Sequence, residues 1–567
     1  MAFFKRLCES RRNAAAAAAS ISFLLLLLVV VCISMRTRHG GTFFFGSGAG
    51  AREQGSCEAE LQALEGRAAR CRYLRSSSHP PCAPTGYVDY LALFYCACGD
   101  EEGLWWSPWL GGAAIALWLL LLFYLLGDTA SEYFCASLEG LSAALRLPPA
   151  VAGVTLLSLG NGAPDVLSSV VAFASDGGEA GDVGLSGALG GALFVSTVVA
   201  GVVAIVAARR GGALIERRGF VRDVCFLLVA LCYLLAVLVA GTVTVWAAAC
   251  FLSLYAGYVL LVSTSHCCSA AADDGGSTNK MKPSDDLAAP LLLPVTVSSK
   301  QPPRTFASGL LAAVHAPLYL PRRLTIPDID GHRWSRPYAI TSALLGPLLL
   351  AVVTSPTSPT ALLAGTLTGT LLAIAAAATT DAAAPPHGRY ARLVWLSGGF
   401  LMSILWSYLL ARELVALLVS TGIIVGVPAS VLGVTVLAWG NSLGDMVADV
   451  AMATQDGAAG AQTAVAGCYA GPAFNTVVGL GLSMALAAGA RYPEPYKIPV
   501  DAATYVTVAF AFLVAGLAWA LVVLPARGMR LDATLGAGLL AVYLCFIAVR
   551  VADAVGVLSL DSLLPRQ

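Results

Sequence analysis

Long apolar runs separated by short polar breaks dominate this sequence. One run covers residues 14–35, and five more lie at roughly 110–127, 148–175, 183–209, 219–241 and 243–264. After a polar stretch, two runs at about 338–356 and 360–379 precede another five at about 391–410, 428–453, 461–487, 502–524 and 533–553. Apolar runs of about 18 residues or more span a bilayer as helices, and the period-two alternation of a transmembrane barrel is missing. The pattern predicts an all-α polytopic membrane protein with about 12–13 transmembrane helices.

The two sets of five runs are copies of one sequence unit. The stretch Gly153–Phe173 matches Gly433–Ala453 without a gap, at a fixed offset of 280 residues. The match continues into the next run, where it pairs Gly187 with Gly467, Gly191 with Gly471, Phe194 with Phe474 and Gly201 with Gly481. Seven helix steps separate the two copies, and because seven is odd the copies cross the bilayer in opposite senses. The sequence therefore predicts an inverted repeat of two five-helix units.

Composition agrees with a membrane protein and narrows the partners. Hydrophobic residues make up 57% of the 567 residues and charged residues only 12%, with a mean hydropathy of +0.76. Soluble proteins carry about a quarter charged residues, so an ordinary soluble fold is excluded. The formal net charge is zero, which gives no indication of a nucleic-acid partner. The lipid bilayer is the partner that composition predicts.

Polar and apolar segments divide the chain into seven predicted parts. They are a signal peptide or signal anchor at 1–38, an extracellular or lumenal cysteine-containing segment at 39–108, the first five-helix repeat at 110–264, a cytoplasmic loop at 265–337, two linking transmembrane helices at 338–379, the second five-helix repeat at 391–553 and a C-terminal tail at 554–567. The composition of the cytoplasmic loop predicts that most of it is flexible.

Charge and cysteine placement predict the orientation. Arginines flank the loops at 210–218 and 525–532, which fall on the same side as the long central loop when the helices are counted. The positive-inside rule makes that side cytoplasmic. The opposite side carries Cys57, Cys71, Cys82, Cys96 and Cys98. Disulfides persist on a non-cytosolic side, although an odd count leaves one thiol over and reduced, buried thiols are the alternative.

Acidic residues inside the predicted spans are the candidate chemistry. Asp165 and Asp445 each follow an asparagine, Asn161 or Asn441, by four residues, so amide and carboxylate share one face of a helix. Asp449 lies one further turn along the second helix. A carboxylate in the middle of a membrane helix costs ~2.5–3.5 kcal/mol, so a functional role is favoured. Two such anions one turn apart repel strongly unless a cation or proton lies between them.

These residues indicate a hard cation. Carboxylate and amide oxygens without thiolate or imidazole select calcium, sodium or magnesium, and Ser442 adds a hydroxyl to Asn161 and Asn441. Pro164 and the neighbouring glycines predict helices that break at mid-membrane and free backbone carbonyls for the ion. Two alternatives stay open: the asparagines hold helices together, and the glycines form a packing surface. The glycines in question are Gly187, Gly191, Gly467 and Gly471.

The motifs resemble those of a known family. GNGAPD at 160–165, GNSLGD at 440–445 and AGPAFN at 470–475 are similar to the two alpha repeats of the calcium/cation antiporter superfamily, specifically its plant-type cation/calcium exchanger family. The stretches at 93–99 and 122–141 resemble that family as well. The resemblance implies a sodium/calcium-exchanger-like inverted repeat. It also implies acidic ligands at Asp165 and Asp445, and Asn475 where potassium-dependent relatives have an aspartate.

Some positions depart from the sodium/calcium relatives. Val195 stands where they have a polar residue, and Gly191 and Gly471 stand where they have serine. Asp449 has no acidic counterpart, because its equivalent in the first repeat is Ser169. Fewer oxygens remain for sodium, and Asp449 is interpreted either as a calcium ligand or as a group for protons or potassium.

The expected function is secondary active antiport. Calcium, with other cations as a further option, would exchange for sodium, potassium or protons by alternating access, without enzymatic activity and without a cofactor. A cation channel or uniporter that uses the same acids is one alternative, and a non-transporting membrane scaffold is another. The expected location is the plasma membrane or an endomembrane such as the vacuole.

Overall fold

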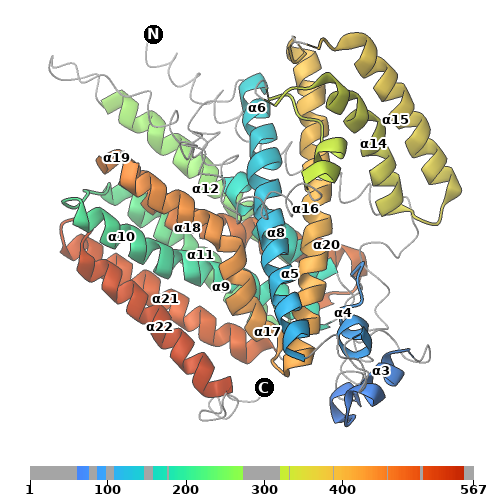
Figure 1. Ribbon diagram of the computed structural model, residues 1–567. Helices are drawn as coiled ribbons and strands as arrows, with labels where there is room; N and C mark the ends of the chain where they lie inside the picture. Colours follow the sequence, from blue (N-terminus) through green and yellow to red (C-terminus); the bar gives the residue numbers. More distant parts are fainter. Residues whose placement is uncertain are drawn as a thin grey trace, which may run out of the picture. The chain divides into compact units, whose positions relative to one another are not determined.

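The computed structural model is helical over nearly all of the chain that it describes (Figure 1). Those residues are 60–75, 86–97, 108–145, 158–174, 178–272, 319–330, 333–382, 384–386, 388–455, 457–498 and 502–554. The predicted signal segment at 1–38 and nearly all of the predicted tail at 554–567 lie outside them. The division of the chain into seven parts therefore stays a prediction.

Helices follow the apolar runs in order. The first set contains α5 (Pro108–Thr129), α6 (Ala136–Leu145), α8 (Ser158–Ala174), α9 (Gly178–Phe194), α10 (Ala200–Arg209), α11 (Arg217–Ala240) and α12 (Val245–Ala272). The linking helices are α14 (Arg336–Thr354) and α15 (Pro359–Thr379). The second set contains α16 (Arg389–Val425), α17 (Ala429–Leu432), α18 (Ala438–Gln455), α19 (Gly457–Phe474), α20 (Gly481–Arg491), α21 (Ala502–Ala526) and α22 (Ala533–Ala554).

Eleven helices of the described chain are long and apolar enough to cross a membrane, and a shorter apolar helix covers Gly162–Ala174. The prediction of an all-α, multi-pass membrane protein is thus confirmed. The first span of each set is longer than predicted, because it runs unbroken over Leu110–Leu141 and Tyr390–Val425. At 1.5 Å per residue these spans measure about 48 and 54 Å, well beyond the ~30 Å hydrocarbon core.

Pi-helical segments occur within several of the membrane-spanning helices. They are η2 (Ala130–Cys135), η4 (Val195–Val199), η7 (Gly433–Leu437) and η8 (Asn475–Leu480). The starts of η4 and η8 are separated by the repeat offset. The prediction of a helix break at Pro164 was wrong, because α8 continues through this proline from Ser158 to Ala174. The irregular backbone lies instead in π-helical turns, which are common near functional sites.

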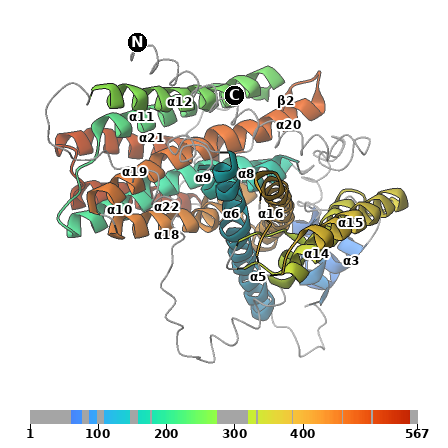
Figure 2. The same ribbon diagram turned by 90° about the horizontal axis from the view of Figure 1, so that it is seen from above.

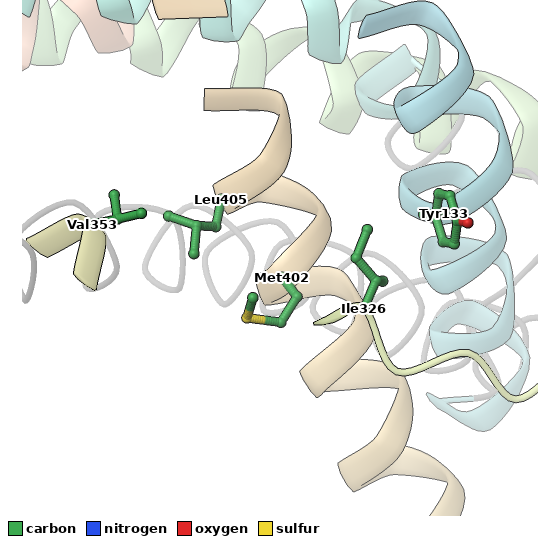
Figure 3. Close-up of a cluster of buried hydrophobic side chains, with 5 residues drawn as sticks. All are labelled: Tyr133, Ile326, Val353, Met402 and Leu405. Atoms are coloured by element: carbon green, nitrogen blue, oxygen red, sulfur yellow. The ribbon is translucent and has the colours of Figure 1, made fainter. Parts of the chain in front are cut away.

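Contacts divide the chain into two compact units. One comprises Met1–Phe43, Asp128–Gly160 and Val259–Leu409, and the other Phe44–Gly127, Asn161–Tyr258 and Leu410–Gln567. In the first unit, buried side chains from η2, the end of the central loop, α14 and α16 pack together (Figure 3). Its members are Tyr133, Ile326, Val353, Met402 and Leu405. The last part of the predicted flexible loop is therefore packed, at least over residues 319–330.

Buried ion pairs hold this loop segment within the first unit. Arg322, 1% exposed, places its Nη1 2.7 Å from Asp128 Oδ2 and donates to Thr129 Oγ1 at 2.9 Å. Arg323 lies 2.7 Å from Asp328 in the same way. Arginine suits such positions because its guanidinium forms several directed hydrogen bonds to carboxylates. Within the first unit, Arg322 of the central loop thus balances the charge of Asp128 in the first span.

The second unit brings the two repeats together at both ends of their helices. Strand β1 (Thr242–Val243), after α11, pairs antiparallel with β2 (Tyr496–Lys497), which precedes α21. Leu214 forms an isolated bridge with Arg530, which joins the α10–α11 loop to the α21–α22 loop. These two loops are the arginine-rich ones expected on one side, and they are in contact. Figure 2 shows α10, α18 and α22 lying side by side in this unit.

A small segment built from α3 (Arg67–Arg75), α4 (Tyr90–Ala92) and η1 (Leu93–Ala97) precedes the first span. The expected disulfide chemistry is present there as a Cys71–Cys96 bond. Arg70 Nη1 donates to Tyr95 Oη at 3.2 Å across the same pair of elements. Cys57, Cys82 and Cys98 lie outside the described residues.

Close backbone packing between the repeats predicts a stability effect. A Cβ atom on Gly190 in α9 would lie 2.5 Å from the carbonyl oxygen of Val434 and 2.7 Å from its Cα. Backbone atoms cannot yield as a flexible side chain does, so Gly190→Ala should destabilise the protein by about 1–3 kcal/mol. The measurement is the thermal unfolding midpoint of the purified protein in detergent.

Gly257 in α12 is the matched control, because nothing lies within 4 Å of its would-be Cβ. Gly257→Ala should leave the midpoint unchanged or raise it, since alanine favours a helix by about 1 kcal/mol over glycine. Equal midpoints for the two variants would contradict the close packing of α9 on η7.

Candidate cation-binding site

Three aspartates from the two repeats meet in the second unit. Asp165 of α8 and Asp449 of α18 are buried, with 7% and 4% of their surface exposed, whereas Asp445 of α18 is partly exposed. Asp445 interacts electrostatically with both Asp165 and Asp449. The structure thus brings the acids of both copies into one cluster, as the repeat predicts.

Asn475, the first residue of η8, joins this cluster directly. Its Nδ2 donates to Asp165 Oδ2 at 2.5 Å, and the residue is 6% exposed. Gly162 makes this approach possible, because a Cβ at that position would lie 2.1 Å from Asn475 Oδ1. The amide therefore orients one oxygen of Asp165, while its own oxygen remains available.

Ser442 and Asn441 add oxygens from the start of α18. A Cβ on Gly191 would lie 3.5 Å from Ser442 Oγ and 3.9 Å from both carboxylate oxygens of Asp165. These groups of the two repeats therefore surround the same glycine. Asn441 Nδ2 donates to Ser168 Oγ at 3.4 Å in α8, which leaves its oxygen as the remaining acceptor.

Three oxygens of this cluster are buried without a hydrogen-bond partner among the described residues. They are Asn441 Oδ1, Ser442 Oγ and Asn475 Oδ1. A buried polar atom without a partner costs about 1–3 kcal/mol, and most such atoms in proteins are satisfied. Unpaired oxygens beside two carboxylates are what a cation-binding site presents.

Asp449 has a different environment from the other two acids. Cys468 Sγ donates to Asp449 Oδ2 at 3.5 Å, and a Cβ on Gly467 would lie 2.5 Å from Oδ1. The carboxylate is packed against the backbone of α19 at Gly467 and against the thiol of Cys468. Its counterpart Ser169 is also buried. The asymmetry read from the sequence is thus present in the fold.

The described residues hold no group of three or more histidine, cysteine, aspartate or glutamate side chains placed to bind a metal ion together. The cluster around Asp165 and Asp445 also contains oxygens other than those of carboxylates. Its additional oxygens come from amides and a hydroxyl, which are weaker ligands than carboxylates.

The remaining predicted residues have separate outcomes. Asn161 lies in α8, but its side chain is outside the described part of the structure. Gly187 packs against Leu437, as expected of a packing surface, whereas Gly191 and Gly467 face the acids. Nothing lies within 4 Å of a Cβ on Gly471. The packing interpretation of the glycines therefore holds for Gly187.

Sequence reasoning missed three neighbours of the acids. Ser168 had a signal, because it follows Asp165 by three residues and so lies near it on the helix surface. Gly162 and Cys468 had none, since their roles depend on how α8 and α19 pack against side chains distant in sequence. Neither contact follows from spacing within one helix.

Known proteins resemble this chain over most of its length. The sequence model described as "Sodium/calcium exchanger protein" matches residues 115–264 and 395–552, the regions of the two repeats. Cation/calcium exchanger 1 of Arabidopsis thaliana is 45% identical over 89% of this chain and 90% of its own. The mitochondrial sodium/calcium exchanger protein of Rattus norvegicus is 31% identical over 87% and 89%.

Among solved structures, the H+/Ca2+ exchanger CAX aligns with a TM-score of 0.42 and 13% identity, over 78% of this chain and 84% of its own. The family match covers more than half of the residues and both repeats. It confirms the family resemblance of the alpha-repeat motifs, and with it a transporter that is not an enzyme. The chain belongs to the sodium/calcium exchanger protein family.

Proposed function

We propose that this protein is a secondary active antiporter that exchanges calcium for a monovalent counter-ion. The observation that carries the proposal is that Asp165 and Asp445 lie in one cluster with three buried oxygens that have no hydrogen-bond partner among the described residues. The names of its relatives, the cation/calcium and sodium/calcium exchangers, support the same substrate class.

The proposed ligands of calcium are Asp165, Asp445, Asn441, Ser442 and Asn475, with Asn161 as a further candidate. Two carboxylates balance the two positive charges of the ion. Calcium takes about six to eight oxygens and accepts flexible geometry, so two bidentate carboxylates with amide and hydroxyl oxygens suit it. Magnesium demands a smaller, nearly octahedral shell and gives up water reluctantly, which makes it a poorer substrate.

Obligatory exchange follows from the cost of buried charge. An empty site would hold the charges of Asp165 and Asp445 in a low-dielectric interior without compensation. The repeats would therefore change their facing direction only when calcium, or monovalent ions or protons, neutralise these carboxylates. Ions then cross in both directions by exchange and do not leak.

The counter-ion is one of sodium, potassium or the proton. Val195 and the two glycines Gly191 and Gly471 leave few side-chain oxygens for a separate sodium site. Asp449, which contacts a thiol and a glycine, belongs in this proposal to the counter-ion and not to calcium. We place the protein in the plasma membrane or an endomembrane such as the vacuole, with the arginine-rich loops in the cytosol.

Neutralising either ligand acid should abolish transport. Asp165→Asn and Asp445→Asn each remove half of the charge that balances calcium, so uptake of radioactive calcium into proteoliposomes should fall by at least about 100-fold, equivalent to about 2.7 kcal/mol. Asp330→Asn, a change at an exposed loop acid, is the control and should transport normally. Calcium uptake at the wild-type rate by a folded Asp165→Asn or Asp445→Asn variant would contradict the proposed site.

Replacing the amide at Asn475 should weaken calcium binding without abolishing it. Asn475→Val mirrors Val195 of the first repeat, removes one proposed ligand oxygen and leaves Asp165 without its 2.5 Å donor. We expect the KM for calcium to rise about 10-fold, because a hydrogen bond to a charged group contributes about 1.5–3 kcal/mol. Asn475→Asp keeps an oxygen and adds charge, so it should retain tighter calcium binding than Asn475→Val.

Imposed gradients identify the counter-ion and separate exchange from channel flow. Calcium uptake should require an opposing gradient of one of sodium, potassium or protons. The Asp449→Ser variant should lose the uptake that this gradient drives, while its KM for calcium, measured in calcium/calcium exchange, stays within about threefold, a change of under 1 kcal/mol. A channel or uniporter would take up calcium without any counter-ion gradient. A scaffold would show no uptake at all.

A further inference from the structure

A tyrosine outside the proposed ligand set contacts two of the helices that form the ion site. Tyr543 of α22 is 7% exposed, and its hydroxyl accepts a hydrogen bond from Nε1 of Trp439 in α18. Its ring also packs edge-on against Phe194 at the end of α9, with 5.7 Å between the ring centroids. One side chain of α22 therefore joins α18 to α9.

Both contacts lie one helical turn from the ion site. Trp439 precedes the proposed ligand Ser442 by three residues in α18. Phe194 follows Gly191 by three residues in α9, and residues three apart are neighbours on a helix surface. The two helices approach each other at this level, since a Cβ on Gly191 would lie 3.5 Å from Ser442 Oγ. Tyr543 therefore links α18 to α9 directly beside their approach at the site.

The first turn of α18 follows irregular backbone. The π-helical segment η7 ends at Leu437, and α18 begins at Ala438, directly before Trp439. A π-helical turn changes the phase of the side chains that follow it, so a regular helix does not by itself set which way this turn faces. The hydrogen bond of Trp439 fixes the turn from outside, and with it the side chains of Asn441 and Ser442.

Lipid offers the indole of Trp439 no replacement for this acceptor. The residue lies ten positions after the start of its span, Ala429–Thr454, and is 40% exposed. The hydrocarbon core of a bilayer holds no water that could accept the N–H. At the repeat offset of 280 the equivalent residue is Leu159, whose side chain has no proton to donate. This link is thus a feature of the second repeat.

The ring of Tyr543 is held independently of its hydroxyl. Phe546, one turn further along α22, is fully buried, and its ring lies 5.8 Å from that of Tyr543. The ring of Phe512 in α21 packs edge-on against Phe546 at 5.7 Å. A phenylalanine at position 543 would keep these ring contacts, so the contribution of the hydroxyl can be tested alone.

We infer that Tyr543 is a positioning residue of the ion site, which holds Asn441 and Ser442 in their binding geometry through Trp439. The inference rests on the proposed ligand set. The hydroxyl of Tyr543 is engaged by Trp439 and its ring by Phe194. It therefore acts through the neighbours of the ligands and supplies no oxygen to the ion.

The test is the Tyr543→Phe variant, measured by calcium/calcium exchange in proteoliposomes, which gives a KM and a maximal rate without any counter-ion. The KM for calcium should rise about 5- to 10-fold, the range expected for the loss of one neutral hydrogen bond. The maximal rate per folded protein should stay close to that of the wild type. A merely structural role would lower the amount of folded protein, and thus the maximal rate, without moving the KM.

Trp439→Phe removes the same hydrogen bond from its donor side and should raise the KM to the same extent. The variant that carries both changes should show no further increase, because the bond can be lost only once. A KM increase equal to the product of the two single increases would contradict the link. Should Tyr543→Phe fail to fold, Trp439→Phe alone tests the same bond.

Two other hydrogen bonds of the second unit provide matched controls. The hydroxyl of Tyr233 in α11 donates to the carbonyl oxygen of Ala247 in α12 at 2.9 Å. The indole of Trp519 in α21 donates to the carbonyl oxygen of Leu535 in α22 at 3.3 Å. Tyr233→Phe and Trp519→Phe should keep the wild-type KM, since neither bond involves a helix that carries a proposed ligand. An equal KM increase in these controls would contradict a specific role of Tyr543.

The outcomes separate this inference from the proposed ion site. A wild-type KM in both Tyr543→Phe and Trp439→Phe, together with loss of uptake in Asp165→Asn, would overturn the positioning role alone. Normal uptake by Asp165→Asn and Asp445→Asn would overturn the ligand set and, with it, this inference.

Discussion

The cost of placing carboxylates inside a membrane protein governs the rest of this structure. Asp165 lies on a short apolar helix, Gly162–Ala174, and Asp445 and Asp449 lie on a helix that is long and apolar enough to cross a membrane, Ala429–Thr454. The three acids meet in one cluster. Such a cluster is tolerated only with compensating charge or protons. The repeat brings the acids together, because Asp165 comes from the first copy and Asp445 and Asp449 come from the second.

Charge is compensated in three different ways along the chain. The proposed ion site has buried oxygens without a hydrogen-bond partner among the described residues, Asp128 is paired with the buried Arg322, and Glu413 accepts hydrogen bonds from neutral donors. The first arrangement can release its partner, whereas the other two are built into the fold. In the proposed function the acids of the first arrangement act on a substrate, whereas the other two hold helices.

Much of this could be predicted from the sequence. Hydropathy located nearly every span, and the fixed offset identified the acids of both copies. Two features could not be predicted from the sequence. The helix α8 runs on through Pro164, a residue type that usually ends or kinks a helix, and the contact of Cys468 with Asp449 depends on side-chain packing between α18 and α19. Periodicity along one helix carries no information about either.

The short pairing of Thr242–Val243 with Tyr496–Lys497 has a consequence for divergence within the family. Its hydrogen bonds join main-chain atoms, so they do not depend on which side chains occupy these four positions. Mutations can accumulate there without severing the connection between the halves. Distant homologues should therefore keep an extended dipeptide at both places even where no residue identity survives.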